Sequence, residues 1–191
     1  GTATDASPMK HTVQTFEGSS LMTYYNDSYG CYVARFNHTP GTAISSGYYK
    51  VDYQSNQAFK DALADGHTLE ALFMYDSEPQ TGTEIKMFSS MQAGGTGFLL
   101  AKEKGEITFL PNLTSGGWQW NRSGVVPERG KYYHVVGVWD KEAQKASVYV
   151  NGELTGSGYG YNFYHKPQIS LNHYWTIDEN SSLSTSLYAS I

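Results

Sequence analysis

The segment from Tyr132 to Leu154 constrains the fold more than any other part of the chain. Its first half alternates two sets of side chains, and a period of two is what a β-strand with two unlike faces requires. This half therefore predicts one strand. One set is Tyr133, Val135, Gly137 and Trp139, and the other is Tyr132, His134, Val136 and Val138.

The second half of the segment predicts two more strands. A polar run at 140–144 ends the first strand, and alternation resumes through Ala146, Val148 and Val150. Asn151-Gly152 follows, and this pair is a strong hairpin signal because both residues tolerate positive φ. Residues 132–154 are therefore expected to form a three-stranded meander.

This meander resembles the central one of laminin-G-like domains, which belong to the concanavalin A-like lectins and glucanases. DGHTLEALF at residues 65–73 resembles the strand that precedes it, and GFLLAKEKGEITF at 97–109 resembles the middle hairpin. The chain also resembles the domain that precedes a calcineurin-like phosphoesterase domain in bacterial extracytoplasmic proteins. The resemblance implies a two-sheet antiparallel jelly-roll sandwich, located in the periplasm, at the cell surface or outside the cell.

Composition points to the same class of fold. The chain has 191 residues with 20 glycines and 16 tyrosines, and only 16% are charged, which is typical of one β-rich domain with many tight turns. We expect one domain over 1–191. Ser55–Ala64 predicts the one short helix, because Phe59 and Leu63 are spaced i, i+4 and Gly66 stands where a C-terminal glycine belongs.

The rest of the chain predicts short strands separated by turns. Strands are expected at 11–16, 31–37, 48–53, 69–75, 85–91, 98–101, 107–110, 118–123, 168–171 and 187–191. Residues 17–26 are expected to form turns, and 155–165 a glycine- and tyrosine-rich loop. The resemblance implies one more strand at each end, so the domain is expected to lack its first and last strands and to come from a longer protein.

Charge and cysteine content exclude several classes of function. The net charge of −5 and the absence of a basic stripe argue against nucleic-acid binding. The sequence has no run of about 18 apolar residues, so it predicts no membrane span. Cys31 is the only cysteine, which excludes an intramolecular disulfide and a thiolate zinc site.

The acidic residues do not form the pattern of a glycosidase. A retaining glycosidase needs two carboxylates roughly 5 to 5.5 Å apart across a cleft. Glu70 and Asp76 are six residues apart, while Glu103 and Glu106 flank a turn. His134 is interpreted as a core histidine. The sequence therefore predicts no catalytic residues and a chain that is not an enzyme.

Aromatic residues are the candidate binding groups. Trp118 and Trp120 are spaced i, i+2, so both would project from one face of a strand, where their rings could stack on sugars. Tyr159, Tyr161 and Trp175 lie in or near the loop that follows the meander. The alternatives are that the tryptophans fill the core between the sheets and that the tyrosines only cover one end of the sandwich.

Calcium is the cofactor of many relatives, held by loop oxygens. Asp178, Glu179 and Asn180 form the compact oxygen-rich cluster, and Asp76 with Glu78 is a poorer one, but a solvated loop explains both. No cofactor or metal site is assigned.

The favoured function is a non-catalytic carbohydrate-binding or surface-adhesion module of a larger extracytoplasmic protein, with a glycan or polysaccharide as partner. The alternative is a structural domain that packs on a neighbouring catalytic domain of the same polypeptide, for example a phosphoesterase. A divergent glycoside hydrolase is the third hypothesis.

Overall fold

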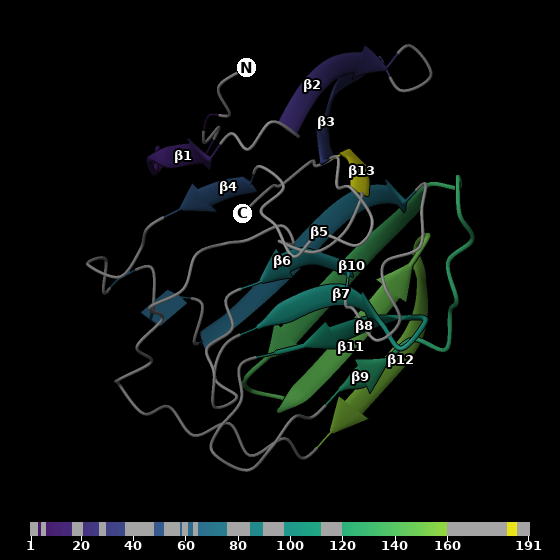
Figure 1. Cartoon of the computed structure of the whole chain (residues 1–191). Coiled ribbons are helices and arrows are strands. Elements are labelled where there is room, and N and C mark those ends of the chain that lie inside the picture. Colours follow the sequence, from purple (N-terminus) through teal and green to yellow (C-terminus); the bar gives the residue numbers. More distant parts are fainter. Residues whose placement is uncertain are drawn as a thin grey trace.

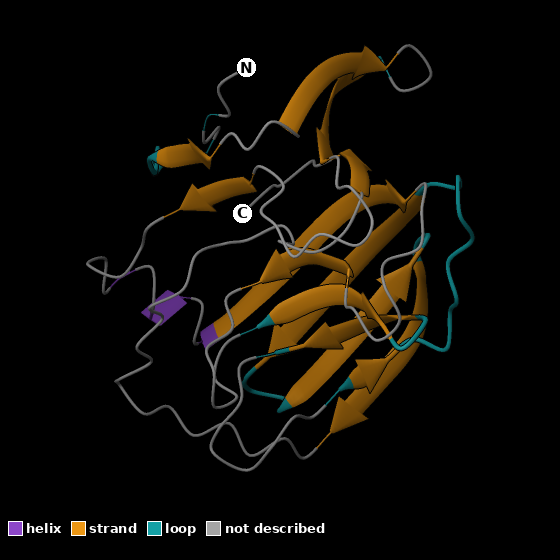
Figure 2. Ribbon diagram, in the orientation of Figure 1, coloured by secondary structure: helices purple, strands orange, loops and turns teal. Residues whose placement is uncertain are grey.

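The computed structural model describes residues 4, 7–16, 21–26, 30–36, 48–51, 58, 61–62, 65–75, 85–89, 98–111, 120–159 and 183–186. The described parts are almost entirely β-strand (Figure 2). Every pairing between these strands is antiparallel. The predicted all-β, two-sheet antiparallel sandwich is confirmed.

The large sheet has seven strands and contains the predicted meander (Figure 1). The meander strands β10, β11 and β12 lie at one end of this sheet. The next strand, β5, pairs with β10 along eight residues, from Tyr133 opposite Phe73 to Asp140 opposite Gly66. In spatial order the strands are β12 (Glu153–Tyr159), β11 (Lys145–Val150), β10 (Tyr133–Asp140), β5 (Gly66–Tyr75), β13 (Leu183–Ser186), β3 (Cys31–Phe36) and β2 (Leu21–Asn26).

The small sheet has four strands and lies over the meander half of the large sheet (Figure 1). A further pair of strands, β1 (Val13–Phe16) and β4 (Tyr48–Val51), forms a separate ribbon. The small sheet runs in the order β6 (Ile85–Ser89), β7 (Leu99–Glu103), β8 (Glu106–Leu110) and β9 (Asn121–Arg122).

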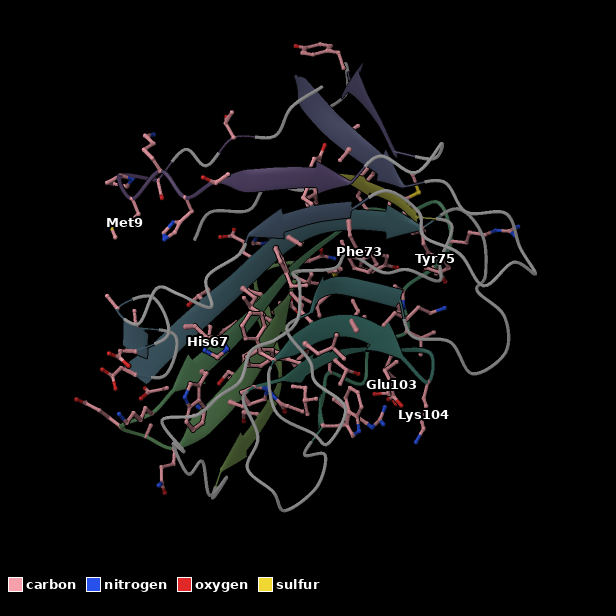
Figure 3. All side chains as sticks on the ribbon, turned by 60° about the vertical axis from the view of Figure 1, so that its left-hand side comes forward. Met9, His67, Phe73, Tyr75, Glu103 and Lys104 are labelled. Atoms are coloured by element: carbon pink, nitrogen blue, oxygen red, sulfur yellow. The ribbon has the colours of Figure 1, made fainter. Side chains whose placement is uncertain are left out.

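The core lies between the large and the small sheet. The inward faces of β5, β10 and β11 meet those of β6, β7 and β8, and Figure 3 shows His67 and Phe73 from β5 on this side. Packing between the sheets requires a glycine at Gly137, because a Cβ there would be 2.5 Å from Cδ2 of Phe109 on the small sheet. The core side chains include Leu69, Phe73, Met87, Leu100, Ile107, Phe109, Val135, Trp139 and Val148.

Two tight turns confirm the hairpins that the sequence predicts. Asn151 and Gly152 have φ of 53° and 84°, and Lys104 and Gly105 have φ of 49° and 88°. Positive φ at both central residues defines the type I′ turn, whose twist matches that of the paired strands. The β11–β12 and β7–β8 hairpins therefore follow directly from local turn chemistry.

Three expectations about local structure were wrong. Residues 21–26 form β2 rather than turns, and 155–159 belong to β12 rather than to a loop. Gly66 is the first residue of β5 and its φ is not positive; a Cβ there would be 3.2 Å from the carbonyl oxygen of Trp139, so close backbone approach explains this glycine. Residues 58, 61, 62 and 65 are helical, and the rest of the predicted helix lies outside the described residues.

The predicted strands at 168–171 and 187–191 also lie outside the described residues. Between them, β13 pairs with both β5 and β3 and joins the two halves of the large sheet. The single domain over 1–191 with absent terminal strands remains a prediction.

Candidate functional site

The predicted binding residues fall into two groups. Trp118, Tyr161 and Trp175 lie outside the described residues, as do both candidate calcium clusters, Asp178–Asn180 and Asp76 with Glu78. Trp120 and Tyr159 lie within the described parts of the chain. The structure therefore locates two of the five predicted residues. Tyr159 ends a strand of the large sheet, and Trp120 lies next to the edge strand of the small sheet.

Trp120 immediately precedes β9 at the edge of the small sheet. It is partly buried and packs against Leu99, Ala101 and Leu110, which form a second apolar cluster on the outer face of this sheet. Trp120 therefore does not fill the core between the two sheets, which was the alternative interpretation. The strand β9 is also shorter than predicted, since it contains only Asn121 and Arg122.

Arg122 links Trp120 to a buried carboxylate. Its Cζ lies 5.9 Å from the centroid of the Trp120 ring, within the range of a cation–π contact. Its Nη2 lies 2.6 Å from Oε2 of Glu103, and its Nη1 donates a hydrogen bond of 3.4 Å to the Glu103 carbonyl oxygen. The Glu103 side chain is only 8% exposed, whereas that of Arg122 is 31% exposed.

A second carboxylate lies directly across the hairpin. Glu103 and Glu106 are register partners in the β7–β8 pair, and Figure 3 shows Glu103 beside Lys104 at the turn of this hairpin. Oε2 of Glu106 accepts a hydrogen bond of 3.1 Å from the Gly124 backbone N–H, and Nζ of Lys104 lies 3.8 Å from Oε1 of Glu103. Both carboxylates therefore have protein partners.

We define the Trp120 corner as Trp120, Arg122, Glu103 and Glu106. Sequence analysis identified Trp120 but missed the role of the other three residues. The turn at Lys104-Gly105 was the available signal, because a two-residue turn places Glu103 and Glu106 opposite each other. Chemically, the corner offers an aromatic ring beside a guanidinium group that an ion pair holds in place.

The outer face of the large sheet carries a carboxylate–imidazole pair. His134 lies on this face, where its Nε2 is 2.6 Å from Oε1 of Glu70, and the two side chains are 42% and 40% exposed. The interpretation of His134 as a core histidine was therefore wrong. Its position follows from register, because the alternate residues of β10 that face inward are Tyr133, Val135, Gly137 and Trp139.

Apolar side chains surround this pair. Val136, Val138 and Tyr149 are half-buried on the same face, and Leu154 of β12 is 50% exposed. Tyr159 is the last residue of β12 and pairs with Lys145 at the edge of the large sheet. The predicted tyrosine site thus begins on a strand rather than in a loop.

The described residues contain neither a candidate metal centre nor a membrane-spanning helix. In this part of the chain no group of three or more His, Cys, Asp or Glu side chains is placed to hold a metal ion. The described helical residues do not form a helix long and apolar enough to cross a membrane.

Comparison with known families gives one match. The model of the concanavalin A-like lectin/glucanases superfamily matches residues 45–182, which is more than half of the chain. A comparison with curated proteins gives no match.

Several solved structures have a similar fold. The binding domain of botulinum neurotoxin DC in complex with SialylT is 9% identical, with a TM-score of 0.63 over 96% of this chain and 41% of that one. A botulinum neurotoxin type C structure, concerned with cell entry that depends on two ganglioside molecules, is 9% identical with a TM-score of 0.64 over 100% and 42%. The binding domain of Paraclostridial Mosquitocidal Protein 1 is 12% identical with a TM-score of 0.59 over 96% and 41%. At these identities the likeness shows the fold alone, and this chain spans about two fifths of the length of those chains.

Proposed function

Because the chain belongs to the concanavalin A-like lectin/glucanase superfamily, we propose that it is a non-catalytic carbohydrate-binding module of a larger extracytoplasmic protein. The superfamily contains both binding proteins and glycosidases, so the fold does not decide between them and the argument depends on the site. We also propose that the chain acts in the periplasm, at the cell surface or outside the cell.

The Trp120 corner is the observation that supports glycan binding. Sugar rings present apolar C–H faces and polar hydroxyl edges, so a site for them combines an aromatic surface with a few fixed polar groups. Trp120 supplies a partly exposed ring, and Arg122 supplies N–H donors beside it. The ion pair with Glu103 holds the guanidinium in position before any ligand arrives.

The partners of the two carboxylates support a non-catalytic role. A glycosidase needs one carboxyl group as acid and another as nucleophile or base, both facing the substrate. Glu103 is paired with Arg122, and Glu106 accepts from the Gly124 N–H. In this arrangement both groups hold β9 and the following residues against the hairpin.

A polysaccharide and glycan binding screen on the purified chain tests this proposal. We expect binding in the wild type and at least a tenfold loss in Trp120→Ala, which corresponds to about 1.4 kcal/mol. Tyr149→Ala is the matched control, because it removes a half-buried aromatic ring from the outer face of the large sheet. Thermal melting of both variants checks the fold.

Either of two results contradicts the proposal: no glycan binds, or both variants bind as the wild type does. Running the screen with calcium and with a chelator tests the calcium dependence that the resemblance allows. Release of reducing sugar from a bound polysaccharide would show a hydrolase instead.

A second candidate function is a structural domain that packs on an attached catalytic domain, for example a phosphoesterase. The outer face of the large sheet favours it, because Leu154 is 50% exposed beside the half-buried Val136 and Tyr149. Leu154→Glu should then lower the melting temperature of the parent protein but not that of the isolated chain. Val126→Glu is the control, because Val126 is 64% exposed on the loop after β9. If Leu154→Glu and Val126→Glu lower the melting temperature of the parent protein equally, this role is contradicted.

A further inference from the structure

We infer that the Trp120 corner binds a neutral saccharide and discriminates against acidic ones that carry carboxylate or sulfate groups. This inference rests on the proposed function and specifies its ligand class.

The cation of the corner is already neutralised. Arg122 makes two contacts with one residue, through Nη2 to the Glu103 carboxylate at 2.6 Å and through Nη1 to the Glu103 carbonyl oxygen at 3.4 Å. The first contact is a close ion pair between a buried carboxylate and a partly exposed guanidinium group. An anionic ligand would therefore have to compete with Glu103 for the same guanidinium group.

Displacing Glu103 would be costly because its carboxylate is buried. Its side chain is 8% exposed, and a buried carboxylate that loses its cation cannot be compensated by water. Lys104 lies 3.8 Å from the other oxygen, but its side chain is 75% exposed, so its charge is screened by solvent. The free energy of breaking the Arg122–Glu103 ion pair would therefore weaken the binding of an anionic ligand.

A second negative charge adds to this discrimination. Glu106 lies opposite Glu103 in the hairpin and accepts the Gly124 N–H, so its carboxylate also borders the corner. Among the described residues, the corner thus contains Glu103 and Glu106 against Arg122, and the exposed Lys104 is the further cation in contact with Glu103. The whole chain has a net charge of −5 as well, so long-range electrostatics also disfavour anions.

A neutral sugar avoids these costs. The guanidinium group has five N–H donors, so a hydroxyl can accept from Arg122 while the pair with Glu103 stays intact. Stacking on the Trp120 ring needs no charge on the ligand. The same geometry that disfavours an acidic saccharide therefore favours a neutral one.

The test compares neutral polysaccharides (laminarin, xylan and galactomannan) with acidic ligands (polygalacturonate, alginate and sialyllactose) at low and high salt. For the wild type we expect binding to a neutral polysaccharide that changes little with salt, and at least tenfold weaker binding to every acidic ligand. Salt dependence distinguishes binding through charge from binding through stacking, because screening by salt weakens interactions between charges but not stacking.

Glu103→Gln is the decisive variant. It keeps the size of the side chain and removes the charge that neutralises Arg122, so acidic ligands should gain at least tenfold in affinity, and this gain should fall at high salt. Glu70→Gln is the matched control, because it makes the same change in net charge on the outer face of the large sheet. It should leave the preference for neutral ligands unchanged.

The outcomes are distinguishable. Salt-sensitive binding of an acidic ligand by the wild type overturns the inference but leaves the proposed function intact. An equal change in affinity for acidic ligands in Glu103→Gln and Glu70→Gln has the same meaning. If no ligand of either class binds, the proposed function fails and the inference fails with it. If Glu103→Gln does not fold, the salt dependence of the wild type still decides the ligand class.

Discussion

The outer faces of the two sheets both carry an acidic residue paired with a basic one, but they differ in burial. On the small sheet, Leu99, Ala101 and Leu110 are 0% exposed and Glu103 is paired with Arg122. On the large sheet, the Glu70–His134 pair is about two fifths exposed and its apolar neighbours are half-buried. The small sheet is therefore buried on both faces near its centre, whereas the described part of the large sheet formed by β5, β10 and β11 has one buried and one partly solvated face.

Burial patterns along single strands show the same difference. From Tyr133 to Val138 the residues of β10 alternate between buried and half-buried, while all five residues of β7 are buried. A strand covered on both faces has no reason to alternate in hydrophobicity. The comparison predicts that equivalent substitutions cost more on the small sheet than on the large one.

The largest difference is expected for apolar truncation. Leu110→Ala should lower the free energy of unfolding by about 3 kcal/mol, because it leaves a cavity at a fully buried site. Val138→Ala removes side-chain volume from the half-exposed face and should cost less than about 1 kcal/mol. Urea unfolding of both variants measures the difference, and equal costs would show that the small sheet is not covered.

The next effect concerns the buried ion pair. Arg122→Ala should cost about 2 kcal/mol, because it leaves the buried Glu103 carboxylate without its close cation. Glu103→Ala should cost less, since the Arg122 side chain is 31% exposed and water can solvate it. The difference in stability between the two variants is the more informative result. If only the attraction between the two charges mattered, both substitutions would lower the stability equally. Thermal melting of both variants provides the comparison.

Sequence patterns predicted the fold wherever local chemistry decides it. Alternation in β10 and the turn residues at Asn151-Gly152 were enough to place the meander, because both signals lie within the residues that form it. The glycines of β12 misled the prediction. Gly156 is required because a Cβ there would overlap the Arg122 carbonyl oxygen, and this contact between sheets cannot be inferred from β12 itself.

The candidate site was harder to predict for the same reason. Trp120 was identified by its residue type. Its neighbour Arg122 pairs with Glu103, which is nineteen positions from Arg122 in the chain, and the two meet only through the register of β7, β8 and β9. His134 shows the limit of alternation, which separates the residues of a strand into two faces without saying which face is buried. Packing against the small sheet decides that question, through Gly137 and Phe109.

A smaller effect is expected for the pair on the solvated face. Glu70 and His134 are both about two fifths exposed, so a double-mutant cycle with Glu70→Ala and His134→Ala should give a coupling energy below about 1 kcal/mol. The same cycle on Glu103 and Arg122 should give a larger value. If the Glu70–His134 coupling equals or exceeds that of the buried pair, burial is not what distinguishes the two faces.

The smallest effect is expected for a pair on the exposed loop after β9. Nζ of Lys131 lies 2.7 Å from Oε1 of Glu128, and this hydrogen bond, followed by the charge of Glu128, raises the pKa of Lys131 above its ordinary value of 10.5. A raised native pKa stabilises the fold at pH values below the unfolded pKa, and the stabilisation disappears as pH rises through the native value. Lys131→Gln should therefore melt slightly below the wild type near pH 8, and the difference should vanish in strong alkali.

Arg129→Gln separates this pair from the general effect of removing a positive charge. It lies two residues away on the same loop, so it removes a positive charge but keeps the Lys131–Glu128 pair. Its effect on melting should therefore lack the step that Lys131→Gln shows as Lys131 deprotonates. The informative quantity is the difference in melting temperature between each variant and the wild type at the same pH. A step of equal size in both variants would assign it to the loss of a positive charge rather than to the Lys131–Glu128 pair.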